Sequence, residues 1–499
     1  MRLFRRSGKR LAGWLLLGLL LQCQLLVFPQ ERFRRNPPYP EPLMPLRLPP
    51  VETAVLDNGL KLVTVTRLNS PIVTLQLLIQ AGELDSPPGL SGLATVTTEM
   101  MLKGTQSMSA SDLEETLETL GIEVNIAVNA DYTLFTFSFI DENFDQALNL
   151  IKSFFSEPAF PAGELLNVKR DLYYRLLSNK REIEKIGFNF FLKKLLSPEL
   201  PNPGIIEEEN IKNISQKDVI NFHRSFIRPN NSIIIVNGPF GLNNASLKVS
   251  QAFSRWVSRP VERPAVPRIE NKNFDRVCFV DVPSKDCVII FGNTVSPINA
   301  ADYFSLMVMN QIVGGLTSSR LFMNLRETKG LAYYAFSDIY HFKNNGLFWV
   351  RARTSPEAVG EVCREIMAEF KNLTEFPPDP LELEKAKTYL IGNFLLQLQN
   401  PDQLNQRLAL QNLYNLPDNF WSRYTENIMV VGPENVREAA RKYLSNKPLI
   451  VIVGKFNPEF DYLKEFDNIE IYDAKGQFQF KLQKGEAGHE TGGMRSQLQ

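Results

Sequence analysis

Three polar side chains on one short predicted helix have the spacing of a metal site. In the stretch "GLSGLATVTTEMMLKGT", Gly89 to Thr105, Thr95 and Glu99 are four residues apart and Thr98 lies between them. Residues i and i+4 lie one above the other on a helix, so two side chains there could converge on one ion. Threonine is a poor zinc ligand, however, and a lone carboxylate does not make a site. The alternative interpretation is the polar face of an amphipathic helix.

Histidine and cysteine are too scarce to supply a zinc site elsewhere. The chain has three histidines, His223, His341 and His489, and no two have metal-ligand spacing on one helix. A histidine-based zinc site needs two or three imidazoles on one wall of a pocket. The four cysteines include no CxxC pair, so we expect no thiolate site either.

The elements that position these residues follow from the apolar pattern. Folded sequence is predicted to begin near Val51, where apolar and polar residues alternate as in a β-meander, and a second hairpin follows at "IEVNIAVNADYTLFTFSFI". Helices are predicted over 91–103, from a cap at Ser109 or Ser111, over 144–156 and from about residue 162.

The same order of elements occurs twice. The strand "SIIIVNGPF" recurs as "LIVIVGKF", and "SEPAFPAGELLNVKRDLYYRLLS" recurs as "TEFPPDPLELEKAKTYLIGNFLL" at nearly the same offset. This pattern predicts an α+β protein of two homologous lobes, each a mainly antiparallel sheet with long helices on one face, that together form a clamshell. A cleft between such lobes is a usual place for a ligand site.

The predicted boundaries follow shifts in composition. The N-terminal lobe spans 51–250, a Pro- and charge-rich linker spans 251–274, and the C-terminal lobe spans 275–460. The tail, 461–499, ends in a polar, glycine-containing segment that we expect to be disordered. Cys278 and Cys287 flank a predicted hairpin. The favoured interpretation is that they are diagonal apolar neighbours, and whether they form a disulfide stays open.

The N-terminus predicts export. Residues 1–28 begin with basic residues and continue as an uncharged apolar run, which is typical of a signal peptide or membrane anchor, and 29–50 form a Pro/Arg-rich tether. The expected location is the bacterial periplasm or cell envelope; a mitochondrial location is less favoured. Whether the leader is cleaved, lipid-modified at Cys23 or retained stays open. A net charge of zero gives no electrostatic case for nucleic acid as a partner.

The helix and its flanks resemble the pitrilysin/insulinase-type zinc peptidases, the inverzincins, and in particular their short two-lobe, processing-peptidase-like members. Those proteins carry "GLAHFLEHMxFKGT", and this chain has "GLATVTTEMMLKGT". The resemblance covers roughly residues 50–460. It implies that the HxxEH positions are Thr95, Thr98 and Glu99, and that the third ligand would fall near residues 174–176, where no acid is present. It therefore implies no metal in this chain.

The resemblance also implies a retained half-site in the second lobe. The segment "GGLTSSRLFMNLRETKGLAY" contains Arg326 and Tyr333 at the separation of a family pair that reaches across the cleft to substrate. A phenol donor can stabilise a developing oxyanion, and an arginine can hold substrate carbonyls. Gly314 and Gly315 would let a substrate strand approach the backbone. The alternative is a helix that ends at Gly330, before a strand with Tyr333 half-buried.

Two hypotheses use these facts. In the first, the chain is the non-catalytic subunit of a heterodimeric zinc metallopeptidase that degrades or processes peptides or unfolded proteins. A homologous HxxEH-containing subunit holds the zinc, and this chain supplies Arg326 and Tyr333. In the alternative, the chain is an inactive scaffold subunit, and a homodimer stays open. The missing ligands disfavour a zinc peptidase that acts alone.

Overall fold

The computed structural model describes residues 48–179, 182–196, 200, 204–263, 265–460, 463 and 465–483 of the 499-residue chain. The predicted leader with Cys23, the tether up to residue 47 and the tail from residue 484 lie outside the described residues. In the described part, no helix is both long enough and apolar enough to cross a membrane.

The first lobe is built on a six-stranded sheet with the order β1-β2-β6-β3-β5-β4. Strands β2 and β6 pair in parallel, and the other neighbours are antiparallel. The strands are β1 (Val51–Val55), β2 (Lys61–Thr66), β3 (Ile72–Ile79), β4 (Glu123–Val128), β5 (Thr133–Ile140) and β6 (Ser232–Gly238).

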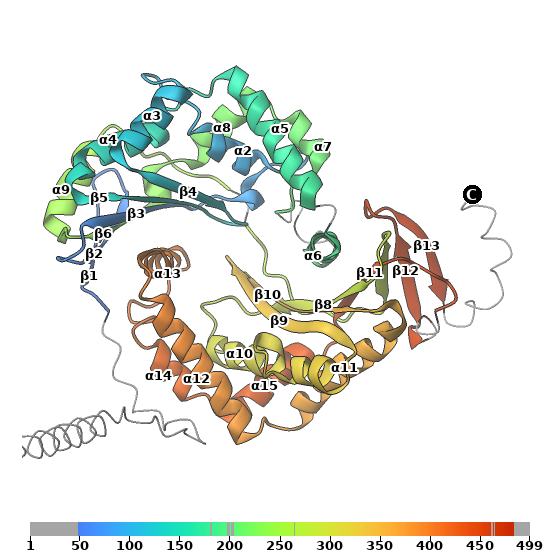
Figure 1. Cartoon of the computed structure of the whole chain (residues 1–499). Coiled ribbons are helices and arrows are strands. Elements are labelled where there is room, and N and C mark those ends of the chain that lie inside the picture. Colours follow the sequence, from blue (N-terminus) through green and yellow to red (C-terminus); the bar gives the residue numbers. More distant parts are fainter. Residues whose placement is uncertain are drawn as a thin grey trace, which may run out of the picture. The chain divides into compact units, whose positions relative to one another are not determined.

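Helices cover one face of this sheet (Figure 1). They are α2 (Leu93–Met100), α3 (Ala110–Leu120), α4 (Phe144–Ser156), α5 (Ala162–Asn179), α7 (Glu208–Asn213), α8 (Gln216–Phe226) and α9 (Leu242–Phe253), with the 3-10 turns η1 (Glu83–Asp85), η2 (Asp141–Asn143) and η3 (Pro229–Asn231). Ser109 is the cap that starts α3, because its hydroxyl accepts from the Asp112 N–H while the Asp112 carboxylate accepts from the Ser109 N–H. The core between sheet and helices contains aromatic rings in contact with one another, among them Phe135, Phe137, Phe154 and Phe155.

The second lobe repeats the first. Its sheet has the order β13-β12-β7-β11-β8-β10-β9, and the five strands β7-β11-β8-β10-β9 match β2-β6-β3-β5-β4 in order and direction. The predicted duplication and the two mainly antiparallel sheets are thus confirmed. The strands are β7 (Val277–Asp281), β8 (Cys287–Val295), β9 (Ala332–Phe342), β10 (Asn345–Thr354), β11 (Leu449–Gly454), β12 (Asn468–Tyr472) and β13 (Phe478–Gln483).

Two features of this sheet differ from the expectations. Strands β12 and β13 lie in the segment predicted as a tail, and they extend the sheet beyond residue 460. The predicted hairpin between Cys278 and Cys287 is wrong, because β11 lies between β7 and β8. Strand β11 follows the helices of this lobe and returns to pair in parallel with β7. Local sequence does not reveal this pairing. Both cysteines are buried free thiols.

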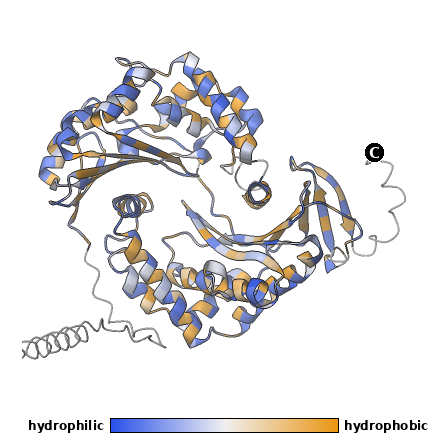
Figure 2. Ribbon diagram, in the orientation of Figure 1, coloured by the Kyte–Doolittle hydropathy of each residue, from blue (hydrophilic) through white to orange (hydrophobic). Residues whose placement is uncertain are grey.

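The helical layer of the second lobe covers the outer face of its sheet (Figure 1). It contains α10 (Tyr303–Asn310), α11 (Val359–Glu375), α12 (Pro380–Gln397), α14 (Tyr424–Met429), α15 (Pro433–Leu444), the π-helical turns η4 (Gln311–Gly315) and η5 (Phe322–Thr328), and the 3-10 turn η6 (Pro356–Ala358). Polar and apolar residues alternate around these helices, as Figure 2 shows.

The lobes exchange one helix each. Helix α6 (Ile183–Leu196) comes from the first lobe and packs on β8 and β11 of the second, where a Cβ on Gly187 would lie 2.8 Å from the Val453 side chain. Helix α13 (Pro401–Leu413) comes from the second lobe and packs on β3 and β6 of the first. There the Asn405 side chain bonds Asn237 Nδ2 at 2.8 Å and the Thr74 carbonyl at 3.2 Å. Each sheet is therefore covered on its second face by a helix of the other lobe.

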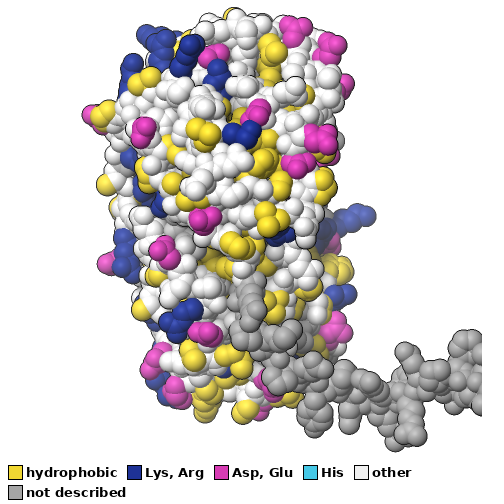
Figure 3. Space-filling model, turned by 90° about the vertical axis from the view of Figure 1, so that its left-hand side faces the viewer, with side chains coloured by type: hydrophobic (Ala, Val, Ile, Leu, Met, Phe, Trp, Pro, Cys, Tyr) yellow, Lys and Arg dark blue, Asp and Glu magenta, His cyan; other side chains and the backbone are white. Residues whose placement is uncertain are grey.

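The surface carries charges of both signs. Figure 3 shows acidic and basic side chains interspersed on the face that it presents, with apolar side chains between them. The distribution agrees with the net charge of zero.

Candidate functional site

Helix α2 carries the three positions of the lost metal motif. Its apolar face, Leu93, Val96 and Met100, is buried, which fixes the polar positions on the opposite side. Gly92 precedes the helix with φ +94, a conformation that side-chain-bearing residues rarely adopt, and a Cβ there would lie 2.9 Å from Ile206. The helix begins at Leu93, after this glycine, and ends at Met100, so it is shorter at both ends than the predicted 91–103.

A buried glutamate occupies the N-terminus of α2. Glu83 is 4% exposed, and its carboxylate accepts from the backbone N–H of Gly92 and of Thr95, both at 2.9 Å. It also accepts from the hydroxyls of Thr95 at 2.5 Å and Ser86 at 3.1 Å. Burial raises the pKa of Glu83, although these hydrogen bonds oppose the shift. Sequence reasoning missed this residue, whose signal was an acid in the segment between β3 and α2.

The other two positions have partners as well. The buried Thr98 hydroxyl donates to the Ala94 carbonyl at 2.7 Å, one turn back along the helix. The Glu99 carboxylate lies 2.5 Å from Arg175 Nη2 on α5. Arg175 stands where the third ligand was expected, so a guanidinium now faces the position of the second histidine.

These residues do not fit a zinc ion. Thr95 and Thr98 use their hydroxyls as donors, and the one carboxylate among the three positions is paired with a cation. Within the described residues, no group of three His, Cys, Asp or Glu side chains could hold a metal. The site has been rebuilt as a hydrogen-bonded helix junction.

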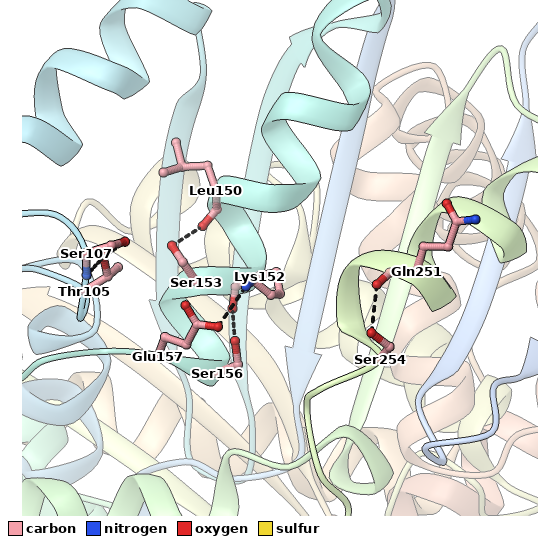
Figure 4. Close-up of polar contacts among 9 residues, drawn as sticks. All are labelled: Thr105, Ser107, Leu150, Lys152, Ser153, Ser156, Glu157, Gln251 and Ser254. Carbon is pink, nitrogen blue, oxygen red and sulfur yellow. Dashed lines mark hydrogen bonds and ion pairs between the residues drawn. The ribbon is translucent and has the colours of Figure 1, made fainter.

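The segment after α2 is tied to the end of α4. Thr105 forms an isolated β-bridge with Pro158, and the Gln106 N–H donates to the Glu157 carbonyl at 2.9 Å. Glu157 also pairs with Lys152 at 2.8 Å, as Figure 4 shows. The "KGT" end of the motif therefore has a structural role in this chain.

In the second lobe, Gly314 and Gly315 lie in the π-helical turn η4. A Cβ on Gly314 would lie 2.5 Å from the backbone nitrogen of Ser337 on β9, and a Cβ on Gly315 would meet the Gln311 side chain. Gly314 is buried, so its small size lets η4 pack closely on β9. Substrate contact by either glycine stays a prediction.

Arg326 and Tyr333 lie on neighbouring elements, η5 and the edge strand β9, which pack together. The Arg326 side chain is half-exposed, and its guanidinium carbon lies 4.9 Å from the centre of the Phe322 ring. Tyr333 is 59% exposed, rather than half-buried.

A β-bulge explains the exposure of Tyr333. Arg353 on β10 pairs with Tyr334, whereas the next residue, Thr354, pairs with Ala332, so Tyr333 is the extra residue of β9. A bulge redirects side chains and is common beside functional sites. The structure thus brings Arg326 and Tyr333 to one sheet edge, while Thr95, Thr98 and Glu99 lie in the other lobe.

Arg320, between η4 and η5, has a structural role. Its guanidinium forms two bonds to the Glu382 carboxylate, at 2.7 and 2.8 Å, and a third to Asn372. His223 and His341 are partly buried, and loss of solvation lowers the pKa of each to about 4. Both imidazoles are therefore neutral packing residues.

Two family descriptions match different parts of this chain. Residues 61–197 match the family "Insulinase (Peptidase family M16)", and residues 213–390 match "Peptidase M16 inactive domain". The chain belongs to the M16 peptidase family. The first match contains α2 and Arg175, and the second contains Arg326 and Tyr333.

Relatives of this M16 protein match along most of their length. An uncharacterized zinc protease of Streptomyces coelicolor is 22% identical and covers 85% of this chain and 92% of its own. An uncharacterized zinc protease of Bacillus subtilis is 21% identical, and the match covers 80% of this chain and 97% of the relative. A probable mitochondrial-processing peptidase subunit beta of Arabidopsis thaliana is 21% identical, with coverage of 84% and 81%.

Solved structures share the fold. A peptidase M16 inactive domain from Pseudomonas fluorescens has a TM-score of 0.76 at 21% identity, covering 82% of this chain and 98% of its own. A protease from Helicobacter pylori has a TM-score of 0.73 at 20% identity, with coverage of 81% and 100%. This chain shares that two-lobe fold, and its residues 213–390 match the family's inactive domain.

Proposed function

We propose that this chain is the non-catalytic subunit of a heterodimeric zinc metallopeptidase that degrades or processes peptides. A homologous HxxEH-bearing partner holds the zinc and the general base. This chain contributes Arg326 and Tyr333 to the shared site, with Gly314 and Gly315 beside the substrate. The pair acts on peptides or unfolded proteins in the bacterial periplasm or envelope, to which the N-terminal segment would direct this chain.

One contrast carries the proposal. The three metal positions have been given other partners, whereas Tyr333 is held out to solvent by a bulge at the sheet edge. An exposed tyrosine and a half-exposed arginine on adjoining elements contribute little to the core. Such groups are suited to a substrate that is not part of this chain.

The chemistry of the two side chains is simple. The Tyr333 hydroxyl would donate a hydrogen bond to the oxyanion that develops as the peptide carbonyl becomes tetrahedral. The Arg326 guanidinium would hold carbonyls of the substrate backbone through several donors. As the edge strand, β9 has unpaired backbone groups on one side, which could receive an extended peptide.

The test is turnover of the reconstituted pair. The native protein is purified with whatever accompanies it, and peptide hydrolysis is measured for Tyr333→Phe and Arg326→Ala. We expect Tyr333→Phe to lower kcat roughly 100- to 1000-fold, because a donor to the transition state is lost. We expect Arg326→Ala to raise KM, because a contact to the substrate backbone is lost. The matched control is Tyr389→Phe, which changes another exposed tyrosine, on α12.

Two results would contradict the proposal. Unchanged turnover in both variants would remove Arg326 and Tyr333 from the site. Purification as a stable self-dimer, without an HxxEH-bearing companion, would favour the scaffold alternative.

A further inference from the structure

Helix α6 makes a polar contact with the strands that carry Tyr333. Glu184, in the first turn of α6, accepts from Tyr334 Oη at 3.3 Å and from Arg353 Nη1 at 3.0 Å. Arg353 also bonds Asp286 Oδ2 through Nε at 3.0 Å and through Nη2 at 2.8 Å. A carboxylate from the first lobe therefore joins β9 and β10 of the second.

The two residues that Glu184 contacts form the last regular pair before the bulge. Tyr334 and Arg353 are directly opposite each other, and Tyr333 is the next residue on β9. On the far side of the bulge, the buried Thr354 hydroxyl donates to the Leu331 carbonyl at 2.6 Å. Tyr333 is thus held between two fixed points, and one of them is formed across the lobe boundary.

A row of rings extends the same contact to Arg326. Tyr334 stacks on Phe336, with ring centres 6.2 Å apart, and Phe336 contacts Phe322 at 5.2 Å. The Arg326 guanidinium in turn lies over the Phe322 ring. A change in the position of Tyr334 would therefore be transmitted to both residues of the half-site.

The charges keep this contact formed over a wide pH range. Burial, with the nearby Glu184 carboxylate, raises the pKa of Tyr334 to about 12, so its hydroxyl remains a donor at neutral pH. The bonds to Asp286 and Glu184 raise the pKa of Arg353. Glu184 faces a permanent cation and a phenol donor.

We propose that Glu184 is a positioning residue, which acts through Tyr334 and Arg353 to set the places of Tyr333 and Arg326. The first lobe thereby controls the geometry of a half-site built entirely from second-lobe residues. The consequence for catalysis rests on the proposed function, but the positioning itself is a property of this chain alone.

The first test uses the isolated full-length chain. 3-Fluorotyrosine is placed at position 333, and its fluorine NMR signal is recorded in Glu184→Ala and in Tyr334→Phe, which removes a single hydroxyl. We expect the signal to shift or broaden in both. Glu182→Ala is the matched control, because Glu182 pairs with Lys185 at 3.2 Å on the exposed start of the same helix. A signal that stays the same in folded Glu184→Ala and Tyr334→Phe would overturn the inference.

The second test uses the reconstituted pair and separates the two proposals. We expect Glu184→Ala to lower kcat about tenfold, because the Tyr333 hydroxyl moves, and to raise KM, because the Arg326 guanidinium moves as well. We expect Glu184→Gln, which keeps an acceptor oxygen, to recover part of the loss. A changed fluorine signal with unchanged kcat would support the positioning role and contradict the shared site. A lowered kcat with an unchanged fluorine signal would contradict the positioning role instead.

Discussion

At the residue scale, the lost metal site has been replaced by specific pairs. The Glu83 carboxylate accepts a hydrogen bond from the Thr95 hydroxyl, and the Arg175 guanidinium places a positive charge beside Glu99. The Arg175 side chain is 55% exposed, and exposed pairs of this kind contribute about 0–1 kcal/mol. The main effect of Arg175 is therefore on what can bind, since a guanidinium at a ligand position repels a divalent cation.

This gives a prediction about restoring the metal. The quadruple variant Thr95→His, Thr98→Glu, Glu99→His and Arg175→Glu should bind about one zinc per chain, because it restores three ligands to one helix junction. The triple variant that keeps Arg175 should bind zinc far more weakly. Metal analysis after dialysis measures both. Equal zinc content in the two variants would show that Arg175 does not exclude the ion.

Part of this site could be predicted from the sequence. The family resemblance implied the three positions on α2 and a third ligand near residues 174–176, where Arg175 lies. The Arg175–Glu99 pair and the Glu83 cap depend on how α5 and η1 pack against α2, which the spacing along the chain does not reveal. Likewise, the bulge at Tyr333 arises from the register between β9 and β10, and the sequence alternates apolar and polar residues too weakly there to show it.

At the element scale, local signals predicted helices well and long-range pairing poorly. Helix α4 has the predicted bounds because its apolar stripe is strong. Helix α6 was not predicted as a separate element. Its packing on the sheet of the other lobe could not be predicted either, because its apolar residues fit either sheet. The predicted Cys278–Cys287 hairpin was wrong for the same reason, since β11 comes from far along the chain.

The packing of α6 on the second sheet makes Gly187 sensitive to substitution. In Gly187→Ala, the added methyl group would lie 2.8 Å from Val453 and 3.1 Å from Ile290. Overpacking typically costs about 1–3 kcal/mol, whereas alanine favours the helix by about 1 kcal/mol over glycine. We expect the free energy of unfolding to fall by roughly 1 kcal/mol, as measured by urea denaturation.

Gly392→Ala is the matched control for this effect. Gly392 lies inside α12, and a Cβ there would meet nothing within 4 Å. The substitution should raise the free energy of unfolding by about 0.5–1 kcal/mol. If the two variants changed stability in the same direction, close packing of α6 would not be the reason for Gly187.

At the scale of the whole molecule, the exchanged helices make the two lobes depend on each other. One buried carboxylate lies at their junction: Asp131, between β4 and β5, is 5% exposed. It accepts from the Lys343 N–H at 2.6 Å and from Tyr414 Oη at 3.1 Å, and both partners belong to the second lobe. The Tyr132 and Tyr340 phenols are close by, and burial raises the pKa of each.

The junction should therefore weaken as the pH rises. Burial raises the pKa of Asp131 from 3.8 to about 6, against the opposing hydrogen bonds. A raised pKa means that the folded state prefers the protonated acid, so this group's contribution to stability is complete below about pH 4 and is lost as the pH rises through about 6. The shift corresponds to roughly 3 kcal/mol at most.

Asp131→Asn tests this dependence, because the amide oxygen can still accept from Lys343 and Tyr414 but does not ionise. We expect the variant and the native chain to have similar free energies of unfolding at pH 4. By pH 7 the variant should be more stable by roughly 1–3 kcal/mol. Denaturant titrations at each pH measure the difference in free energy of unfolding between the variant and the native chain. Groups that titrate equally in both proteins do not contribute to this difference. A difference that stays constant from pH 4 to pH 7 would mean that Asp131 titrates alike in the folded and unfolded chain, and the junction would then not be sensitive to protons.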